Sequence, residues 1–146
     1  MKVKNGKETV TTKIAYIAGF FDGEGCIRIK QASQRGNSYY VWVAITNSNR
    51  RILEEVVELF GGTIRKAERT VNKDVYHYLI TASEAVDFLT TIMGFLREKK
   101  GQAEIAIEFH KNKVHLSAED KAKYADTISR MKQVKSSATS TRTSNS

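Results

Sequence analysis

The chain has 146 residues, with 24 Lys and Arg against 16 Asp and Glu, so its formal net charge is +8. With 40% hydrophobic and 27% charged residues, the composition is that of one folded globular domain and excludes disordered, collagenous and fibrous chains. The single cysteine, Cys26, excludes an intramolecular disulfide and therefore a secreted cystine scaffold. The positive charge favours a polyanionic partner, but charge alone does not separate DNA from RNA or from a membrane surface.

The longest apolar run, residues 14–21, is too short to cross a bilayer and is followed at once by acidic residues. It comes after a basic N-terminus, as the apolar part of a signal peptide does, but no small-residue cleavage site follows it. We therefore expect no membrane partner. The expected location is intracellular, in the cytoplasm or nucleoid, or in an organelle if the host is eukaryotic.

Hydrophobic periodicity predicts a first helix over residues 13–23, with Thr11 or Thr12 as its N-cap. From residue 26 to residue 46, apolar and polar side chains alternate with a period of two. A Gly36-Asn37 turn interrupts this alternation, which predicts a long β-hairpin.

A second helix and a second hairpin follow. Apolar residues return to helical spacing over residues 49–60, and Gly61-Gly62 ends this helix. The second hairpin is predicted from strands at 63–69 and 75–81, joined by a turn around residues 72–74.

The rest of the chain is predicted to be helical until its last residues. A helix with Ser83 as its N-cap runs over 83–93, Gly94 breaks it, and further helices span 95–111 and about 117–134. Residues 136–146 are almost entirely Ser, Thr, Ala and Asn, so we expect a disordered tail after a single domain over residues 1–135. The order of elements predicts an α+β fold, with helices covering one face of an antiparallel sheet.

The opposite face of the predicted sheet combines cations, amides and aromatic rings. Its members are Arg28, Lys30, Gln34, Ser38, Tyr40, Trp42, Thr46, Arg65 and Arg69. A solvated face is common in antiparallel sheets, but exposed aromatic rings beside cations favour a contact surface. A two-stranded ribbon fits the DNA major groove, where Arg, Lys and Gln contact base edges. The parity of the fourth strand is open between Tyr76 with Tyr78 and Val75 with His77, and we assign Tyr76 and Tyr78 to the surface.

The first predicted helix carries small residues on one side and acids at its end. Ala15, Gly19 and Gly23 stand four residues apart, a spacing that lets two helix backbones approach closely. Tight packing on the chain's own sheet explains this stripe, but not the two carboxylates and two glycines of residues 22–25.

Residues 17–25, Ile-Ala-Gly-Phe-Phe-Asp-Gly-Glu-Gly, resemble the nine-residue motif of the LAGLIDADG homing endonucleases, with Glu24 as the last acid. These are intron- and intein-encoded DNA-cutting enzymes. The resemblance covers the helix and hairpin order up to about Lys111, and the motif occurs once, as in the homodimeric subfamily. It implies an αββαββα core with a DNA-binding sheet and C-terminal helices. It also implies double-strand cleavage of a long pseudo-palindromic site, leaving short 3′ overhangs.

Phosphodiester hydrolysis requires an activated water and neutralised charge, which metal ions held by carboxylates supply. The resemblance implies that Glu24 and the carbonyl of Gly23 hold Mg²⁺ or Mn²⁺, and we expect Ca²⁺ to bind without supporting cleavage. Two copies of the first helix crossing at a two-fold axis would bring both Glu24 side chains together. The expected interface residues are Ala15, Ala18, Gly19 and Asp22.

Three further positions carry over from the family. Residues 95–103 resemble the segment that holds a basic residue near the active-site water, which assigns this role to Lys99, or to Lys100 if the register slips. Asn47 and Arg50 resemble the polar and basic side chains near the cleaved phosphates. Without the resemblance, each of these residues would be a solvated side chain near a helix terminus.

Other functions fit the sequence less well. An intron RNA maturase or a DNA-binding regulator on the same fold is the main alternative, and Glu24 together with Lys99 favours the nuclease over it. A general RNA-binding domain is a third alternative. His110 and His115 lack the cysteine pair of a zinc site, and Cys26 stands where a calcium loop needs an oxygen ligand.

Overall fold

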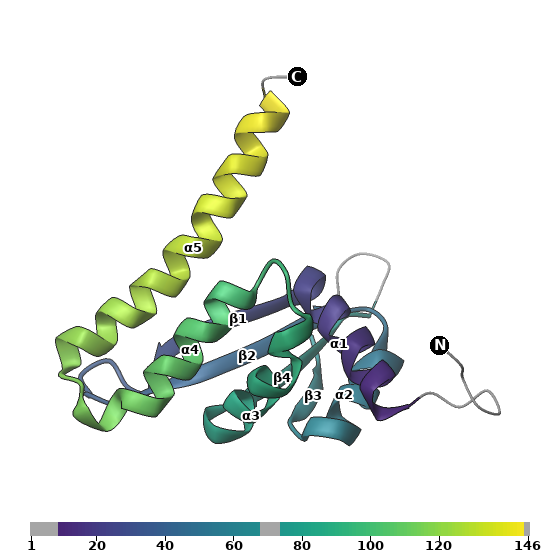
Figure 1. Cartoon of the computed structure of the whole chain (residues 1–146), viewed down its shortest axis with the longest axis horizontal. Coiled ribbons are helices and arrows are strands. Elements are labelled where there is room, and N and C mark those ends of the chain that lie inside the picture. The colour runs from purple at the N-terminus through teal and green to yellow at the C-terminus, as the bar shows by residue number, and fades with distance from the viewer. Residues whose placement is uncertain (1–8, 68–73, 145–146) are drawn as a thin grey trace.

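The computed structural model describes residues 9–67 and 74–144, with side chains through residue 131. Arg69 lies outside these ranges. The elements run in the order α1 (Val10–Glu24), β1 (Gly25–Gln31), β2 (Tyr39–Asn47), α2 (Arg50–Phe60), β3 (Thr63–Lys66), β4 (Tyr76–Thr81), α3 (Ala82–Ile92), η2 (Met93–Phe95), α4 (Lys100–Asn112), η3 (Lys113–His115) and α5 (Ala118–Ser144) (Figure 1).

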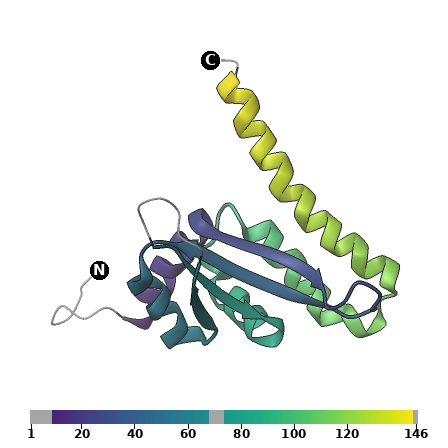
Figure 2. The ribbon, with the colours of Figure 1, turned by 180° about the vertical axis from the view of Figure 1, so that it is seen from behind.

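The strands form one antiparallel sheet in the order β1-β2-β4-β3. Helices α1, α3 and α4 lie against one face, and Figure 2 shows the sheet in front of them from the other side. The predicted α+β fold with a helix-covered antiparallel sheet is therefore confirmed.

The core lies between the sheet and its helices. Ile27 on β1 pairs with Val43 on β2, which pairs in turn with Ile80 on β4, and each is at most 2% exposed. From the helices, the rings of Phe21 and Phe88 meet edge to face at 5.2 Å between their centroids. The period of two thus buries the aliphatic side of each strand, because successive side chains point to opposite faces.

The ends of α1 and α2 follow from local chemistry. Thr9, not Thr11 or Thr12, caps α1, because its Oγ1 accepts a hydrogen bond from the backbone N–H of Thr12 at 3.0 Å. Gly61 and Gly62 end α2 with φ of +83° and +94°. Only glycine adopts such angles at little cost, so this predicted stop is confirmed.

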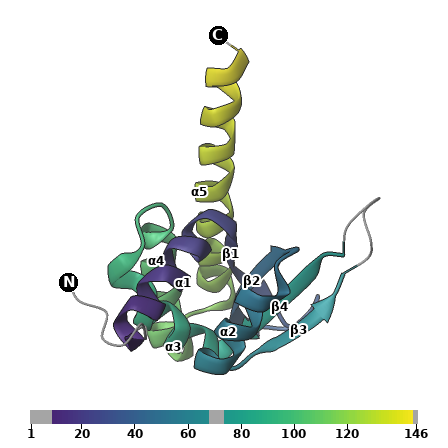
Figure 3. The same cartoon turned by 90° about the vertical axis from the view of Figure 1, so that its right-hand side faces the viewer.

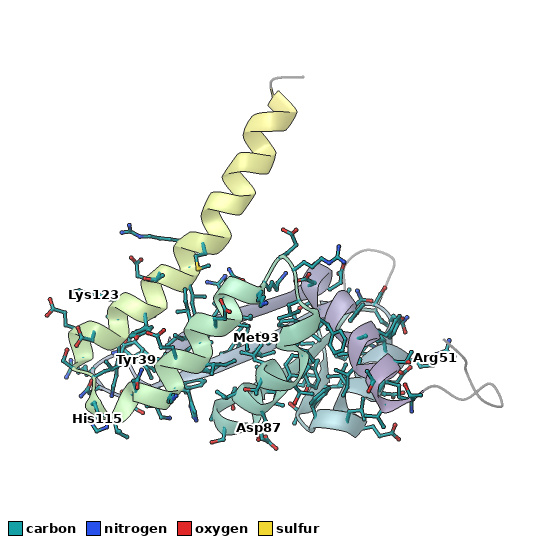
Figure 4. The ribbon with its side chains drawn as sticks, viewed as in Figure 1. Tyr39, Arg51, Asp87, Met93, His115 and Lys123 are labelled. Atoms are coloured by element: carbon teal, nitrogen blue, oxygen red, sulfur yellow. The ribbon has the colours of Figure 1, made fainter. Side chains whose placement is uncertain are left out.

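The segment after α3 differs from the prediction. The chain leaves α3 through η2, where Met93 packs against the core between α3 and α4 (Figure 4). It then continues through residues 96–99 without helix, so α4 begins at Lys100 and not at residue 95. Likewise, α3 begins at Ala82, one residue before the predicted cap Ser83.

Helix α5 packs on α4 and β1 and then extends away from the body (Figure 3). The structure continues this helix through residue 144, across most of the segment whose composition predicts a disordered tail. Residues 117–146 contain neither glycine nor proline, the residues that most often end a helix. Within the described ranges, no helix is both long and apolar enough to cross a membrane.

Candidate nucleic-acid interface and active site

The face of the sheet away from the core helices carries cations beside aromatic rings. On β1 and β2, Arg28 lies opposite Trp42 and Lys30 lies opposite Tyr40. The Lys30 ammonium lies 3.9 Å from the centre of the Trp42 ring. This geometry is that of a cation–π contact, which keeps both groups on the surface in a defined arrangement.

Strand β4 presents His77 to the same face. His77 is exposed and lies between Thr46 on β2 and Arg65 on β3 in the sheet register. The Thr46 Oγ1 lies 2.7 Å from His77 Nδ1, so a hydrogen bond fixes the imidazole ring. These residues surround a hollow of about 200 Å³ that also includes Trp42 and Leu79. The outer face is therefore hollowed and carries cationic, polar and apolar side chains.

The assignment of Tyr76 and Tyr78 to this face is wrong. Tyr78 is 0% exposed, and its hydroxyl donates a hydrogen bond to the carbonyl of Gly61 at 2.7 Å. Burial, with a smaller effect of the Glu84 charge, raises the pKa of Tyr78. Tyr76 has the same parity and packs against the core. The pattern of β4 misleads because aromatic and aliphatic side chains stand on both of its faces.

Two other predicted contacts lie at the hairpin loop. Because β1 ends at Gln31, Gln34 and Ser38 belong to the exposed connection before β2 and not to the strands. The ammonium of Lys121 on α5 donates a hydrogen bond to the carbonyl of Asn37 at 2.9 Å. The C-terminal helix thus holds this loop at one point.

The structure brings two of the predicted catalytic side chains into contact. Glu24 is the last residue of α1, and Asn47 is the last residue of β2. Because β1 starts directly after α1 and pairs with β2, these two ends lie side by side. The Asn47 Nδ2 donates a hydrogen bond to Glu24 Oε1 at 3.2 Å, and Asn47 Oδ1 accepts the N–H of Asn49 at 2.9 Å. The amide therefore orients an exposed carboxylate.

Lys99 reaches the same end of α1 through Asp22. Its Nζ donates a hydrogen bond to the main-chain carbonyl of Asp22 at 2.7 Å. The Asp22 carboxylate accepts the backbone N–H groups of Arg97, Glu98 and Lys99 at 2.8, 2.9 and 2.8 Å. Desolvation alone raises the pKa of Asp22, but these donors and the Lys99 charge together lower that pKa below its ordinary value.

Arg50 occupies the first position of α2, three residues after Asn47. Its Nε forms an ion pair with Glu54 at 2.8 Å, and its guanidinium lies 5.3 Å from the centre of the Tyr76 ring. Arg50 is exposed, in the segment that follows the end of β2.

The oxygens at the end of α1 suit a magnesium ion. Mg²⁺ in enzymes is commonly bound by one or two carboxylates, with water and substrate phosphates completing its shell. Glu24 supplies an exposed carboxylate, and Gly23 belongs to the last helical turn, whose carbonyls lack helical donors. Among the described residues, no three His, Cys, Asp or Glu side chains gather closely enough to hold a metal by themselves.

The exposed side of α1 does not include every residue of the predicted dimer interface. Ala18 is 0% exposed and faces the core, so its assignment to a dimer interface is wrong, and Asp22 faces residues 97–99. Gly19 and Gly23 are exposed, and a Cβ added to either would meet no described atom within 4 Å. Tyr16, which is not among the predicted interface residues, is 55% exposed on this side. Its one-turn spacing from Gly19 could have identified it.

A family model described as a LAGLIDADG-like domain matches residues 11–94, more than half of the chain. No curated protein matches the chain. Among solved structures, the archaeal intron-encoded homing endonuclease I-Vdi141I, complexed with DNA, is similar with a TM-score of 0.70 and 22% identity. That match covers 84% of this chain and 86% of the other.

Two further structures extend the comparison. The homing endonuclease I-CvuI, in complex with a DNA target in the presence of Mg, matches with a TM-score of 0.68 and 21% identity, over 83% of this chain and 82% of that one. The meganuclease I-SmaMI, bound to uncleavable DNA, matches with a TM-score of 0.60 and 20% identity. Here the match covers 90% of this chain but 46% of the meganuclease. The chain therefore belongs to the LAGLIDADG-like family and has the fold of the LAGLIDADG homing endonucleases.

Proposed function

We propose that the protein is an intracellular, site-specific endonuclease that acts as a homodimer and cuts both strands of a long DNA site. The observation that carries this proposal is the exposed Glu24 carboxylate at the end of the motif helix, which Asn47 holds, with the Lys99 ammonium bonded to the carbonyl of Asp22 two residues earlier. The same domain presents a cationic and aromatic sheet face. Structures of similar fold are described as homing endonucleases complexed with DNA.

Two observations support the homodimer. One side of α1 is exposed and carries Tyr16, Gly19 and Gly23. Because the two glycines have no side chains, a second copy of the helix can approach this side closely. The chain also corresponds to less than half of the meganuclease I-SmaMI. In a pair of chains, two Glu24 carboxylates meet at the two-fold axis, one for each DNA strand.

The residues at the end of α1 have different roles in the proposed reaction. Mg²⁺ or Mn²⁺, when bound, supplies an activated water and neutralises charge on the phosphate oxygens, whereas Ca²⁺ binds without supporting cleavage. Glu24 and the Gly23 carbonyl would hold the ion, and Asn47 orients the Glu24 carboxylate. The cations of Lys99 and Arg50 stabilise the negative charge that develops on the phosphate. The products carry short 3′ overhangs.

The sheet sets the length of the target. Strand β2 has nine residues, which span about 30 Å and therefore about nine base pairs of B-form DNA. Two copies related by a two-fold axis thus cover a pseudo-palindromic site of about twenty base pairs. Arg28, Lys30 and Arg65 contact bases and phosphates along each half-site.

The proposal is tested on DNA in which the two sequences that flank the gene's intron are joined. We expect Mg²⁺-dependent double-strand cutting near the junction, and none when the ion is removed by a chelator. The matched control is Glu24→Gln, which keeps the shape of the side chain but removes its charge. This variant should bind the DNA with nearly unchanged affinity and should not cut it.

The other outcomes contradict the proposal in distinct ways. Tight binding of the wild type without cutting would favour a maturase or a regulator. Cutting by the Glu24→Gln variant would show that the metal site lies elsewhere. Preference for RNA without any need for a divalent ion would indicate an RNA-binding domain.

A further inference from the structure

We propose that Asp22 is a positioning residue for DNA cleavage, which fixes Lys99 beside Glu24 instead of contacting a second copy of the chain. This inference rests on the proposed function, in which Lys99 stabilises charge on the phosphate. It assigns different tasks to the two acids of the motif, although they are two residues apart in the sequence.

The first argument is that Asp22 holds a remote segment of backbone. Its Oδ2 accepts the N–H groups of Arg97 and Glu98 at 2.8 and 2.9 Å, and its Oδ1 accepts the N–H of Lys99 at 2.8 Å. Both oxygens are therefore engaged with residues 97–99, the connection that leads into α4. A carboxylate at the N-terminal end of a helix also complements the helix dipole.

The second argument is that Lys99 is held at both of its ends by the same residue. Its main-chain N–H donates to the Asp22 carboxylate, while its Nζ donates to the Asp22 carbonyl at 2.7 Å. A lysine side chain ordinarily samples many rotamers. Here the two bonds fix where the side chain starts and where its ammonium ends, in the last turn of α1 that also carries Glu24.

The third argument is that ordinary helix capping requires less than this arrangement. Helix α4 begins at Lys100, and a single side chain such as Ser117, whose Oγ accepts the N–H of Asp120 at 3.1 Å, is sufficient at the start of α5. Asp22 instead arrives from another helix and accepts three donors. The bond from Lys99 Nζ adds nothing to the cap, but it does set the position of a charge in the last turn of α1, which ends at Glu24.

The test is a double-mutant cycle on Asp22→Asn and Lys99→Met, with single-turnover cleavage and DNA affinity measured separately. Asp22→Asn should lower the cleavage rate by about 10- to 100-fold, the cost of a misplaced catalytic group, with DNA affinity almost unchanged. In the Lys99→Met background, Asp22→Asn should lower the rate no further. The matched control is Ser117→Ala, which also removes a helix cap but should cleave like the wild type. Each protein is assayed under conditions in which circular dichroism shows that it is folded.

Each remaining outcome overturns the inference. Independent, multiplicative losses from the two substitutions would mean that Asp22 supports the fold only. Loss of the dimer by Asp22→Asn would place Asp22 in the interface instead. If that variant does not fold, Asp22→Glu replaces it, because it keeps the charge and displaces the carboxylate by one methylene. A wild type that does not cut removes the proposed function and this inference together, whereas a cutting wild type with an equally active Asp22→Asn variant removes the inference alone.

Discussion

Neighbouring residues of β4 have opposite surroundings, because a strand directs successive side chains to opposite faces of its sheet. His77 lies on the outer face against Thr46, while Tyr78 is fully buried and donates its hydroxyl proton to Gly61. One of these side chains is therefore available to DNA, and the other belongs to the core.

Substitutions at these two positions should separate binding from stability. Tyr78→Phe leaves the Gly61 carbonyl without its phenol donor, so we expect the free energy of unfolding to fall by about 1–2 kcal/mol. DNA affinity should not change. His77→Ala should weaken DNA binding and leave stability within about 0.5 kcal/mol, as is usual for exposed positions. Urea denaturation and a DNA-binding titration of both variants check this, and the reverse pattern would contradict the assignment of faces.

His110 should make stability depend on pH. Desolvation, followed by the Lys113 charge, lowers its pKa below the ordinary value of 6.5, although Asp87 acts in the opposite direction. Its Nδ1 is buried and has no hydrogen-bond partner among the described residues. Protonation is therefore easier in the unfolded chain, so the free energy of unfolding should fall as the pH drops through about 6.5.

The measurement is a pair of urea denaturation curves at pH 7.5 and pH 5.5, for the wild type and for His110→Gln. The variant should lose less stability between the two pH values, because its side chain does not titrate. An equal loss in both proteins would assign the effect to other groups.

At single positions, the sequence predicts well which residues lie together where they match a motif. The resemblance selects Glu24, Asn47 and Lys99, and the structure gathers all three at the end of α1. It fails where partners come from remote segments. The carboxylate of Asp22 binds backbone more than 70 residues away, and no local pattern in the sequence encodes such a contact.

Among the elements, α1 shows most directly how one helix can have two uses. Its inner side buries Ile17, Ala18 and Phe21, while Gly19 and Gly23 leave its outer side bare. Glycine in the middle of a helix costs roughly 0.5–1 kcal/mol relative to alanine. Nothing within the described part of the chain crowds these positions, so the proposed contact with a second chain would account for this cost.

Gly19→Leu should therefore separate folding from assembly. In the single chain, no described atom lies within 4 Å of the Cβ that leucine adds. Leucine also has a higher helix propensity than glycine, so the melting temperature of the monomer should not fall. The dimer should be lost, because the side chain prevents close approach of the helices. Sedimentation measures the assembly, and Glu104→Leu, at an exposed position of α4, is the matched control. A Gly19→Leu dimer of unchanged affinity would place the interface elsewhere.

The order of the elements follows from periodicity, but their boundaries depend on tertiary contacts. Gly61 and Gly62 end α2 where the sequence predicts, because their positive φ is a local property of the backbone. The start of α4 is not predicted, because the N–H groups of residues 97–99 bond to Asp22 instead of forming another helical turn.

For the whole molecule, DNA affinity should depend both on its positive charge and on the two-fold symmetry of the proposed dimer. The net charge of +8 attracts nucleic acid at long range, whereas the cations that we propose to contact DNA are those on the outer sheet face. Arg28, Lys30 and Arg65 stand on this face. In contrast, Lys123 and His115 lie at the end of the body far from α1 (Figure 4). A two-fold dimer presents every residue of the face twice, so a substitution on this face alters two contacts with DNA in each complex.

The salt dependence of DNA binding should reveal this doubling. The three sheet-face cations in each copy give six in the dimer, which together contribute about −5 to the slope of log affinity against log salt. Replacing a cation that neutralises a phosphate reduces the slope by about 0.9 for each copy bound. Lys30→Gln should therefore make the slope less steep by about 1.8 if two copies bind, and by about half as much if one copy binds. Lys111→Gln, at an exposed position on α4, should leave the slope unchanged. A change of about 0.9 for Lys30→Gln would mean that DNA is bound by one chain at a time, in contradiction to the homodimer.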